Sequence, residues 1–179
     1  THLQEIVKNQ KLLKILNQDK PHNRFRDIEL ILRYLALSEG YITNLNNYRN
    51  NMKSFINNYM ATYRNSDSNV INDITLKVET SILKVYNIFG EQAFRRWIPE
   101  SNTFDKKINL SIMDCQMIIC EKYDLEHLQK FKQELNSSFK NLFSDSEFLA
   151  SITEGTSNRN NILYRLNKTL EAFDKVLTL

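Results

Sequence analysis

The side chains best suited to bind a charged partner form a basic and aromatic group in the middle of the chain. Arg95, Arg96 and Trp97 are consecutive, and Lys106 and Lys107 follow closely. Cations beside an aromatic ring can hold a phosphate backbone while the ring stacks on a base. The alternative is a tryptophan that packs into the fold with arginine stems across it. We favour packing, because a net charge of +3 is small for a nucleic-acid-binding protein. The group remains our candidate surface for nucleic acid or another partner.

A second group of charges precedes the most apolar run of the sequence. It consists of Arg24, Arg26, Asp27, Glu29 and Arg33. In a helix, Glu29 and Arg33 would face each other as a surface pair worth about 0.3–0.5 kcal/mol. The cations of this group could also contact a phosphate or a nucleotide. We favour a structural ion-pair cluster, because charges that enter a protein core are usually paired.

The sequence contains no motif that we recognise for catalysis, cofactor binding or metal ligation. Cys115 follows Asp114, but no neighbour in sequence would activate its thiol, so we expect a buried and inert side chain. Asp73, Glu79 and Asp114 lack the spacing of metal ligands. No Gly-rich phosphate loop, nucleophile elbow or His–Glu zinc pair occurs. We therefore predict no catalytic residue, no metal and no cofactor for this chain.

Two unusually apolar segments would have to position these side chains. We predict helices at 27–39 and 109–123, because apolar residues surround most of each helix and therefore require neighbours on all sides. Asp27 and Asn109 are the expected N-caps of these helices, and Gly40 is the expected end of the first.

The other segments indicate an all-α fold. Amphipathic helices are predicted at 2–17, 48–63, 66–89, 125–142, 144–150 and 157–179. The least regular part, 91–107, is expected to be a short helical turn at 91–96 followed by a loop or a short extended piece. No segment alternates apolar and polar residues over the length of a strand. We predict a compact bundle of about seven or eight helices with two mostly buried inner helices.

Composition limits the class of protein further. A chain of 179 residues fits one domain. No apolar run approaches the roughly 20 residues that span a bilayer. The two cysteines match neither a disulfide framework nor a zinc site, so we expect a cytoplasmic protein with reduced thiols and no membrane partner. Both ends of the chain fall inside apolar patterns, and we expect residues 1–179 to be one helical domain of a longer multidomain protein.

Four sets of residues carry a resemblance to a known family. They are Arg-Asp-x-Glu-Leu-x-Leu-Arg-Tyr-Leu-Ala at 26–36, Met-x-x-Phe-Ile-x-x-Tyr-Met at 52–60, Ala-Phe-Arg-Arg at 93–96, and Lys-Ile-Asn-Leu at 107–110 followed by Asp-x-Gln-Met at 114–117. In order and spacing they resemble the helical region of GmrSD-type proteins. This is a large bacterial family of restriction-defence proteins and proteins of unknown function. The resemblance covers most of residues 1–124.

The resemblance implies a function outside catalysis for this chain. Complete members of the family begin with a ParB/sulfiredoxin-like nucleotide-binding module, and many end with an HNH-type nuclease module. The nucleotide module's Asp-Gly-Gln-Gln-Arg motif is absent here, and His2, His22 and His127 are too scattered for that nuclease. The implied role is a helical scaffold that couples such modules in a nucleotide-dependent DNA endonuclease of phage defence. Its partners would be those modules and, through them, DNA.

Two other functions stay open from the sequence. The apolar face of the terminal helix, at 157–179, could form a homodimer or bind another protein. The basic and aromatic group could bind nucleic acid weakly and in a salt-dependent way. Neither alternative requires the chain to be an enzyme.

Overall fold

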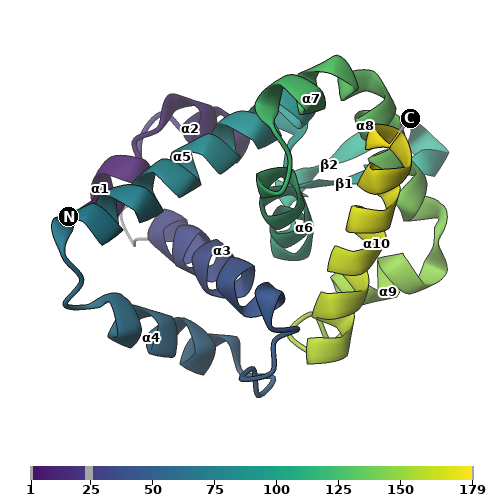
Figure 1. The fold of residues 1–179 in the computed structure, drawn as a ribbon. Coiled ribbons are helices and arrows are strands. Elements are labelled where there is room, and N and C mark those ends of the chain that lie inside the picture. Colours follow the sequence, from purple (N-terminus) through teal and green to yellow (C-terminus); the bar gives the residue numbers. More distant parts are fainter. Residues whose placement is uncertain (1, 23–25, 179) are drawn as a thin grey trace.

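Helices make up most of the chain (Figure 1). The computed structural model describes residues 2–22 and 26–178. Within these ranges the α-helices are α1 (His2–Ile6), α2 (Gln10–Leu16), α3 (Arg26–Ile42), α4 (Met52–Tyr63), α5 (Ser68–Phe89), α6 (Leu110–Glu121), α7 (Leu125–Lys130), α8 (Lys132–Asn141), α9 (Ser146–Thr153) and α10 (Arg159–Leu177). The other elements are the strands β1 (Arg95–Ile98) and β2 (Thr103–Ile108) and the 3-10 turns η1 (Gly90–Gln92), η2 (Pro99–Ser101) and η3 (Leu142–Ser144). The mainly helical class is confirmed, whereas the predicted count of seven or eight helices is wrong.

The count is wrong because local backbone signals divide two of the predicted helices. In the segment 2–17, the side chain of Asn9 accepts backbone N–H groups at the start of α2, so a new helix begins there. In the segment 125–142, the backbone of Phe131 leaves the helical region with φ −109° and ψ 25°, which separates α7 from α8. By contrast, the helix predicted at 66–89 is a single element.

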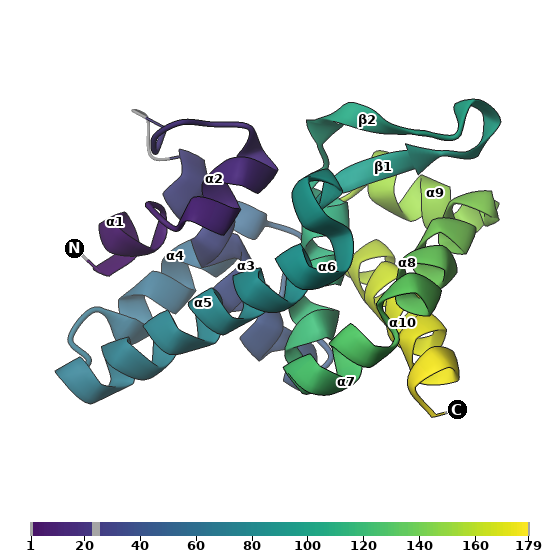
Figure 2. The same cartoon turned by 90° about the horizontal axis from the view of Figure 1, so that it is seen from above.

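Helix α6 is the centre of the fold. Every residue from Ser111 to Cys120 is buried, and α3, α5 and α10 pack around the helix. Figures 1 and 2 both show α3 and α5 on one side of α6 and α10 on the other. The inner helix predicted at 109–123 is confirmed. Its predicted N-cap is also confirmed, because the side chain of Asn109 accepts the N–H groups of Ser111 and Ile112 at 2.8 and 3.2 Å.

Helix α3 is the second inner helix, and it differs from the prediction at both ends. Asp27 lies in its first turn rather than at its N-cap. The helix also continues past Gly40. A Cβ atom at Gly40 would lie 2.7 Å from side-chain carbons of Leu45 and Phe55. Glycine therefore permits the close approach of the Leu45 and Phe55 side chains to α3, and it does not end the helix.

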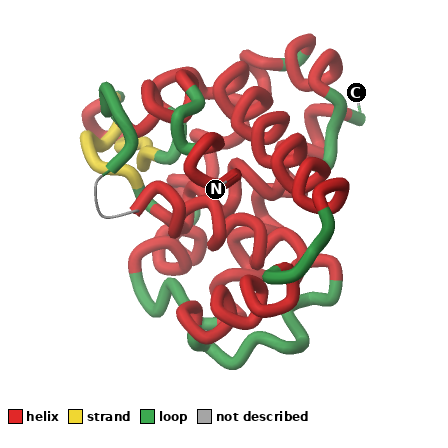
Figure 3. The backbone as a smooth tube through the Cα atoms, turned by 90° about the vertical axis from the view of Figure 1, so that its left-hand side faces the viewer, coloured by secondary structure: helices red, strands yellow, loops and turns green. Residues whose placement is uncertain are grey.

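Strands β1 and β2 form an antiparallel hairpin in the segment where we expected a short helical turn at 91–96 and then a loop or a short extended piece. Arg95 pairs with Ile108 and Trp97 with Phe104, with an irregularity in the register between Arg95 and Trp97. This bulge interrupts the alternation of polar and apolar residues, so the sequence shows no strand pattern here. The all-α expectation is wrong for this segment. Figure 3 shows the hairpin at one edge of the helical body.

Helix α4 covers the core from outside. Its only buried residue is Ile56, while Met52 and Tyr59 are partly buried against the core. Met60 remains 39% exposed. The apolar stripe predicted at 48–63 is therefore a docking face of a peripheral helix rather than an inner surface.

The cap of α6 gives a first test of the fold. The amide of Asn109 also donates to the carbonyl of Ile152 in α9 at 3.1 Å, so Asn109→Ala removes a cap and a bond between helices. We expect a loss of about 2 kcal/mol in the free energy of unfolding. The matched control is Asp67→Ala, because Asp67 caps α5 through two backbone N–H groups and should cost about 1 kcal/mol. Urea unfolding followed by circular dichroism measures both, and equal losses would contradict a contribution from the Ile152 bond.

Candidate functional site

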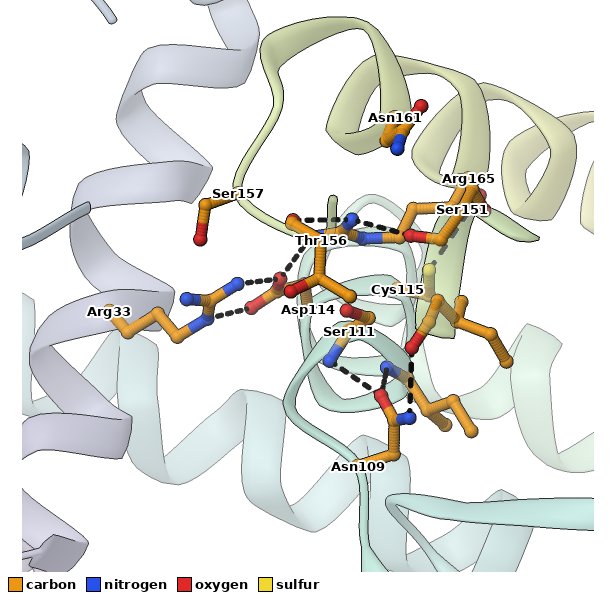
Figure 4. A network of polar contacts seen from close by, with 12 residues as sticks. Arg33, Asn109, Ser111, Asp114, Cys115, Ser151, Thr156, Ser157, Asn161 and Arg165 are labelled. Atoms are coloured by element: carbon orange, nitrogen blue, oxygen red, sulfur yellow. Dashed lines mark hydrogen bonds and ion pairs between the residues drawn. The ribbon is translucent and has the colours of Figure 1, made fainter. Parts of the chain in front are cut away.

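A fully buried carboxylate lies at the centre of α6. Asp114 is 0% exposed. Arg33 of α3 binds it with two parallel hydrogen bonds, Nε to Oδ1 at 2.8 Å and Nη2 to Oδ2 at 2.6 Å. Arg165 of α10 donates from Nη2 to the same Oδ2 at 2.8 Å. Figure 4 shows the two guanidinium groups reaching Asp114 from different helices. We call these three residues the ion triad.

The second arginine of the triad reaches a further part of the chain. Nη1 of Arg165 donates to the carbonyl oxygens of Ser151 at 3.1 Å and Thr156 at 2.9 Å. Ser151 belongs to α9, and Thr156 lies in the loop that leads to α10. The guanidinium therefore joins α6, α9 and that loop, and carbonyl oxygens share the positive charge that one carboxylate does not balance.

The triad is an arrangement for holding helices together rather than for chemistry. Burial by itself would lower the pKa of Arg33, but the attraction of Asp114 is greater and the pKa is raised. Arg33 therefore stays charged, and each oxygen of the carboxylate already accepts a hydrogen bond. A carboxylate so bound is neither a free base nor an open metal ligand.

A second polar cluster joins α3 to α5 and α6. The carboxylate of Glu121 accepts hydrogen bonds from Tyr34 at 2.8 Å and from Ser38 at 2.7 Å. Lys77 of α5 forms an ion pair with it at 3.1 Å. Burial raises the pKa of the Tyr34 phenol, and the charge of Glu121 raises it further, so Tyr34 acts here as a hydrogen-bond donor.

A strained residue connects the hairpin to α6. Phe94 is buried and has φ 65°, which is unusual for an aromatic residue. Its N–H donates to Oε1 of Gln116 at 2.7 Å, and its carbonyl accepts the N–H of Asn109 at 2.7 Å. These bonds offset a backbone strain of about 1–3 kcal/mol and fix the direction in which β1 leaves the core.

The structure redistributes the predicted ion-pair cluster. Arg33 pairs with Asp114, 81 positions away in sequence, and not with Glu29. Asp27 is buried and accepts the backbone N–H of His22 at 2.5 Å. Arg26 and Glu29 are exposed, and Arg24 lies outside the described residues. The sequence offered no signal for the Asp114 partner except that an acidic residue stands in an otherwise apolar helix.

The residues of the predicted basic and aromatic surface differ in their surroundings. The ring of Trp97 packs against Phe104 with centroids 4.9 Å apart, and Nζ of Lys140 in α8 lies 4.0 Å from the Trp97 ring centroid. The tryptophan is thus packed against the fold, as we favoured. Arg96 is partly buried beside it.

Arg95 takes no part in the ring contacts of Trp97. It is 8% exposed, and its Nη1 donates to the carbonyl oxygens of Glu91 and Ala93. Burial lowers the pKa of Arg95, and the nearby Glu91 offsets this only in part. No carboxylate among residues 2–22 and 26–178 forms an ion pair with Arg95. Its guanidinium charge is therefore not neutralised by a partner.

The two predicted groups meet around one open pocket of about 620 Å³ between α2, α3, α4 and the hairpin. Among the residues that the structure describes, five cationic side chains line it: Arg26, Arg33, Arg95, Lys106 and Lys107. The carboxylates of Asp27 and Glu29 line it as well. The apolar part of the described lining consists of Leu16, Leu30, Met52, Ile56, Ile108 and Leu110, and the remaining residues are Asn17, Gln18 and His22. We call this cavity the basic pocket, and sequence reasoning missed it because the two groups are some 70 residues apart.

Other kinds of site are not formed by the described residues. Within 2–22 and 26–178, no group of three or more His, Cys, Asp or Glu side chains could hold a metal ion. In the same ranges, no helix has both the length and the apolar character needed to cross a membrane.

Comparisons with known proteins return no match: no protein-family model fits the sequence, and no curated protein and no solved structure is significantly similar. The resemblance to GmrSD-type proteins therefore stays a prediction. Fold and site together define the class as a mainly helical protein with a buried ion triad at its centre. An open basic pocket lies beside this triad.

The ion triad predicts a large cost for removing its carboxylate. Asp114→Asn would leave two buried guanidinium groups without an anion, and we expect a loss of about 3–5 kcal/mol in the free energy of unfolding. The control is Glu171→Gln, which removes an exposed pair with Lys168 and should cost less than about 1 kcal/mol. Chemical denaturation measures both, and a loss of similar size in the two variants would contradict the structural role of the triad.

The burial of the two cysteines predicts that their thiols are unreactive in the folded protein. Cys115 and Cys120 are buried, which confirms the burial expected for Cys115, and burial raises the pKa of each thiol to about 12. Both are therefore protonated near neutral pH, and the nucleophilic thiolate is absent. We expect no reaction with Ellman's reagent at about pH 8 in the folded protein and full reaction of both thiols in denaturant. Rapid labelling of the native chain would show that one thiol is accessible.

Proposed function

We propose that this chain is a non-catalytic helical scaffold that couples neighbouring modules of a GmrSD-like, nucleotide-dependent restriction-defence protein. The observation that carries the proposal is the ion triad. It ties α3, from the first third of the chain, to α10 at its end through the carboxylate of α6. Helices joined in this way move together, which is what a connector between modules requires.

The residues behind the resemblance support the same role. Arg33 belongs to the motif at 26–36, Phe94 to the motif at 93–96, and Asp114 and Gln116 to the motif at 114–117. Arg33 binds Asp114, and the N–H of Phe94 binds Gln116. The polar residues of these motifs thus serve the internal architecture of the bundle, which favours a structural over a catalytic reason for their presence.

The arrangement of the helices favours coupling as well. Helix α1 and the last turn of α10 lie at opposite sides of the molecule in two views (Figures 1 and 2). The alternative of a homodimer through the terminal helix is less well supported, because the apolar residues of α10 pack inside this chain. Those buried in α10 include Ile162, Leu166, Phe173 and Leu177. A dimer would need another surface.

Hydrogen exchange tests the coupling directly. If α3, α6 and α10 form one rigid unit, their slowest amides should exchange with similar free energies of opening, while amides of α4 exchange sooner. In Asp114→Asn, protection should fall in all three helices together. A loss of protection confined to α6 would contradict the proposed coupling.

Activity assays test the non-catalytic part of the proposal. The isolated chain, incubated with nucleoside triphosphates, Mg²⁺ and supercoiled DNA, should neither hydrolyse nucleotide nor nick DNA. Turnover that persists through further purification and disappears in a pocket variant such as Lys106→Glu would overturn it.

A further inference from the structure

The basic pocket has the charge of an anion site. Arg33 is committed to Asp114, but Arg26, Lys106 and Lys107 form no ion pair with any of the described residues. Together with Arg95, four cations therefore face the cavity without a partner carboxylate. The described lining holds five cations against two carboxylates, whereas the chain as a whole carries only +3. A nucleic-acid duplex would need a longer basic surface.

The two carboxylates of the described pocket lining do not cancel its positive charge. Asp27 is 2% exposed and already accepts a backbone N–H group. Among the described lining residues, Glu29 is the exposed carboxylate, against the exposed cations Arg26, Lys106 and Lys107. A ligand with a single compact anionic group could approach the lysines of β2.

The rest of the lining indicates what such a ligand would carry besides charge. A volume of about 620 Å³ is in the range of small-molecule sites. Oε1 of Gln18 is buried and accepts no hydrogen bond within the described part of the chain. Gln18 lines the same pocket. An unsatisfied buried acceptor is costly, and a hydroxyl or amine of a ligand would satisfy it. The apolar side chains of the lining would contact the uncharged part of the ligand.

We propose that the basic pocket binds a small phosphate monoester whose organic part carries a hydrogen-bond donor. The phosphate lies on Lys106, Lys107 and Arg26. The donor faces Gln18, and the organic part lies along Leu30 and Ile108. Sugar phosphates and nucleoside monophosphates share this chemistry. The inference goes beyond the scaffold role and does not depend on it.

Calorimetric titration of the whole chain tests the proposal with three probes: ribose 5-phosphate, adenosine 5′-monophosphate and inorganic phosphate. Both esters should bind saturably and more tightly than inorganic phosphate. Tighter binding of adenosine 5′-monophosphate than of ribose 5-phosphate would mean that the apolar lining contacts the base. Equal affinities of the two esters would indicate a site for a sugar phosphate. No saturable binding of either ester up to about 10 mM would overturn the proposal.

Charge reversal identifies the pocket as the site. The variant Lys106→Glu/Lys107→Glu changes two exposed side chains of β2. It should lower the affinity for both esters by about tenfold or more. The matched control is Lys132→Glu/Lys175→Glu, which makes the same change of charge at exposed positions of α8 and α10. It should change the affinities by less than about twofold. Equal weakening in the two variants would mean non-specific attraction and would overturn the proposal.

A third variant tests the donor contact without changing charge. Gln18→Leu should weaken the binding of both esters and leave the affinity for inorganic phosphate unchanged.

A single-stranded oligonucleotide serves as the competing probe. If it bound through the lysines while neither ester did, the pocket would be part of a nucleic-acid surface and the proposal would be wrong. Circular dichroism of each variant establishes that it is folded.

Discussion

A single buried carboxylate constrains the arrangement of this fold. Moving Asp114 from water into the core costs several kcal/mol, and only close, well-oriented cations can offset that cost. Arg33 and Arg165 supply them from α3 and α10. Because each guanidinium must reach the same carboxylate, the depth and rotation of both helices relative to α6 are fixed. Apolar packing alone tolerates small shifts of a helix, whereas this geometry does not.

The same reasoning explains the polar residues within an almost uniformly buried helix. Ser111, Asp114 and Gln116 stand among apolar neighbours in α6, and each is buried. Asp114 faces α3 and α10, while Gln116 binds the backbone of Phe94 before the hairpin. An apolar helix with no preferred face could rotate about its own axis among apolar neighbours. Directional bonds on separate sides select one rotation, so the polar residues specify the arrangement more than they add to its stability.

Local signals in the sequence predicted the helices better than their assembly. The cap Asn109 follows from chemistry within a few residues, and it is confirmed. Gly40 misled the prediction, because the reason for glycine there is a contact with Phe55 in another helix. The hairpin was missed because its bulge interrupts the pattern of alternation.

Long-range contacts explain why the candidate site could be predicted only in pieces. Both charged groups were visible in the sequence, yet nothing in it showed that Arg33 would bind Asp114 or that Lys106 and Arg26 would line the same pocket. The expectation that Trp97 packs against the fold needed only the general behaviour of aromatic side chains. The bonds of Arg95 to the carbonyl oxygens of Glu91 and Ala93 and the positive φ of Phe94, on the other hand, are not predicted by any residue type.

The triad and the basic pocket are parts of one structure, because α6 and α3 contribute to both. Arg33 binds Asp114 and also lines the pocket. The hairpin wall of the pocket starts from Phe94, whose N–H and carbonyl are held by Gln116 of α6 and by its N-cap Asn109. A ligand that drew the lysines of β2 towards α3 would therefore pull on segments that α6 already holds in place. The rigidity that the ion triad gives to the helices would also keep the pocket formed before a ligand arrives, so that little ordering would oppose binding.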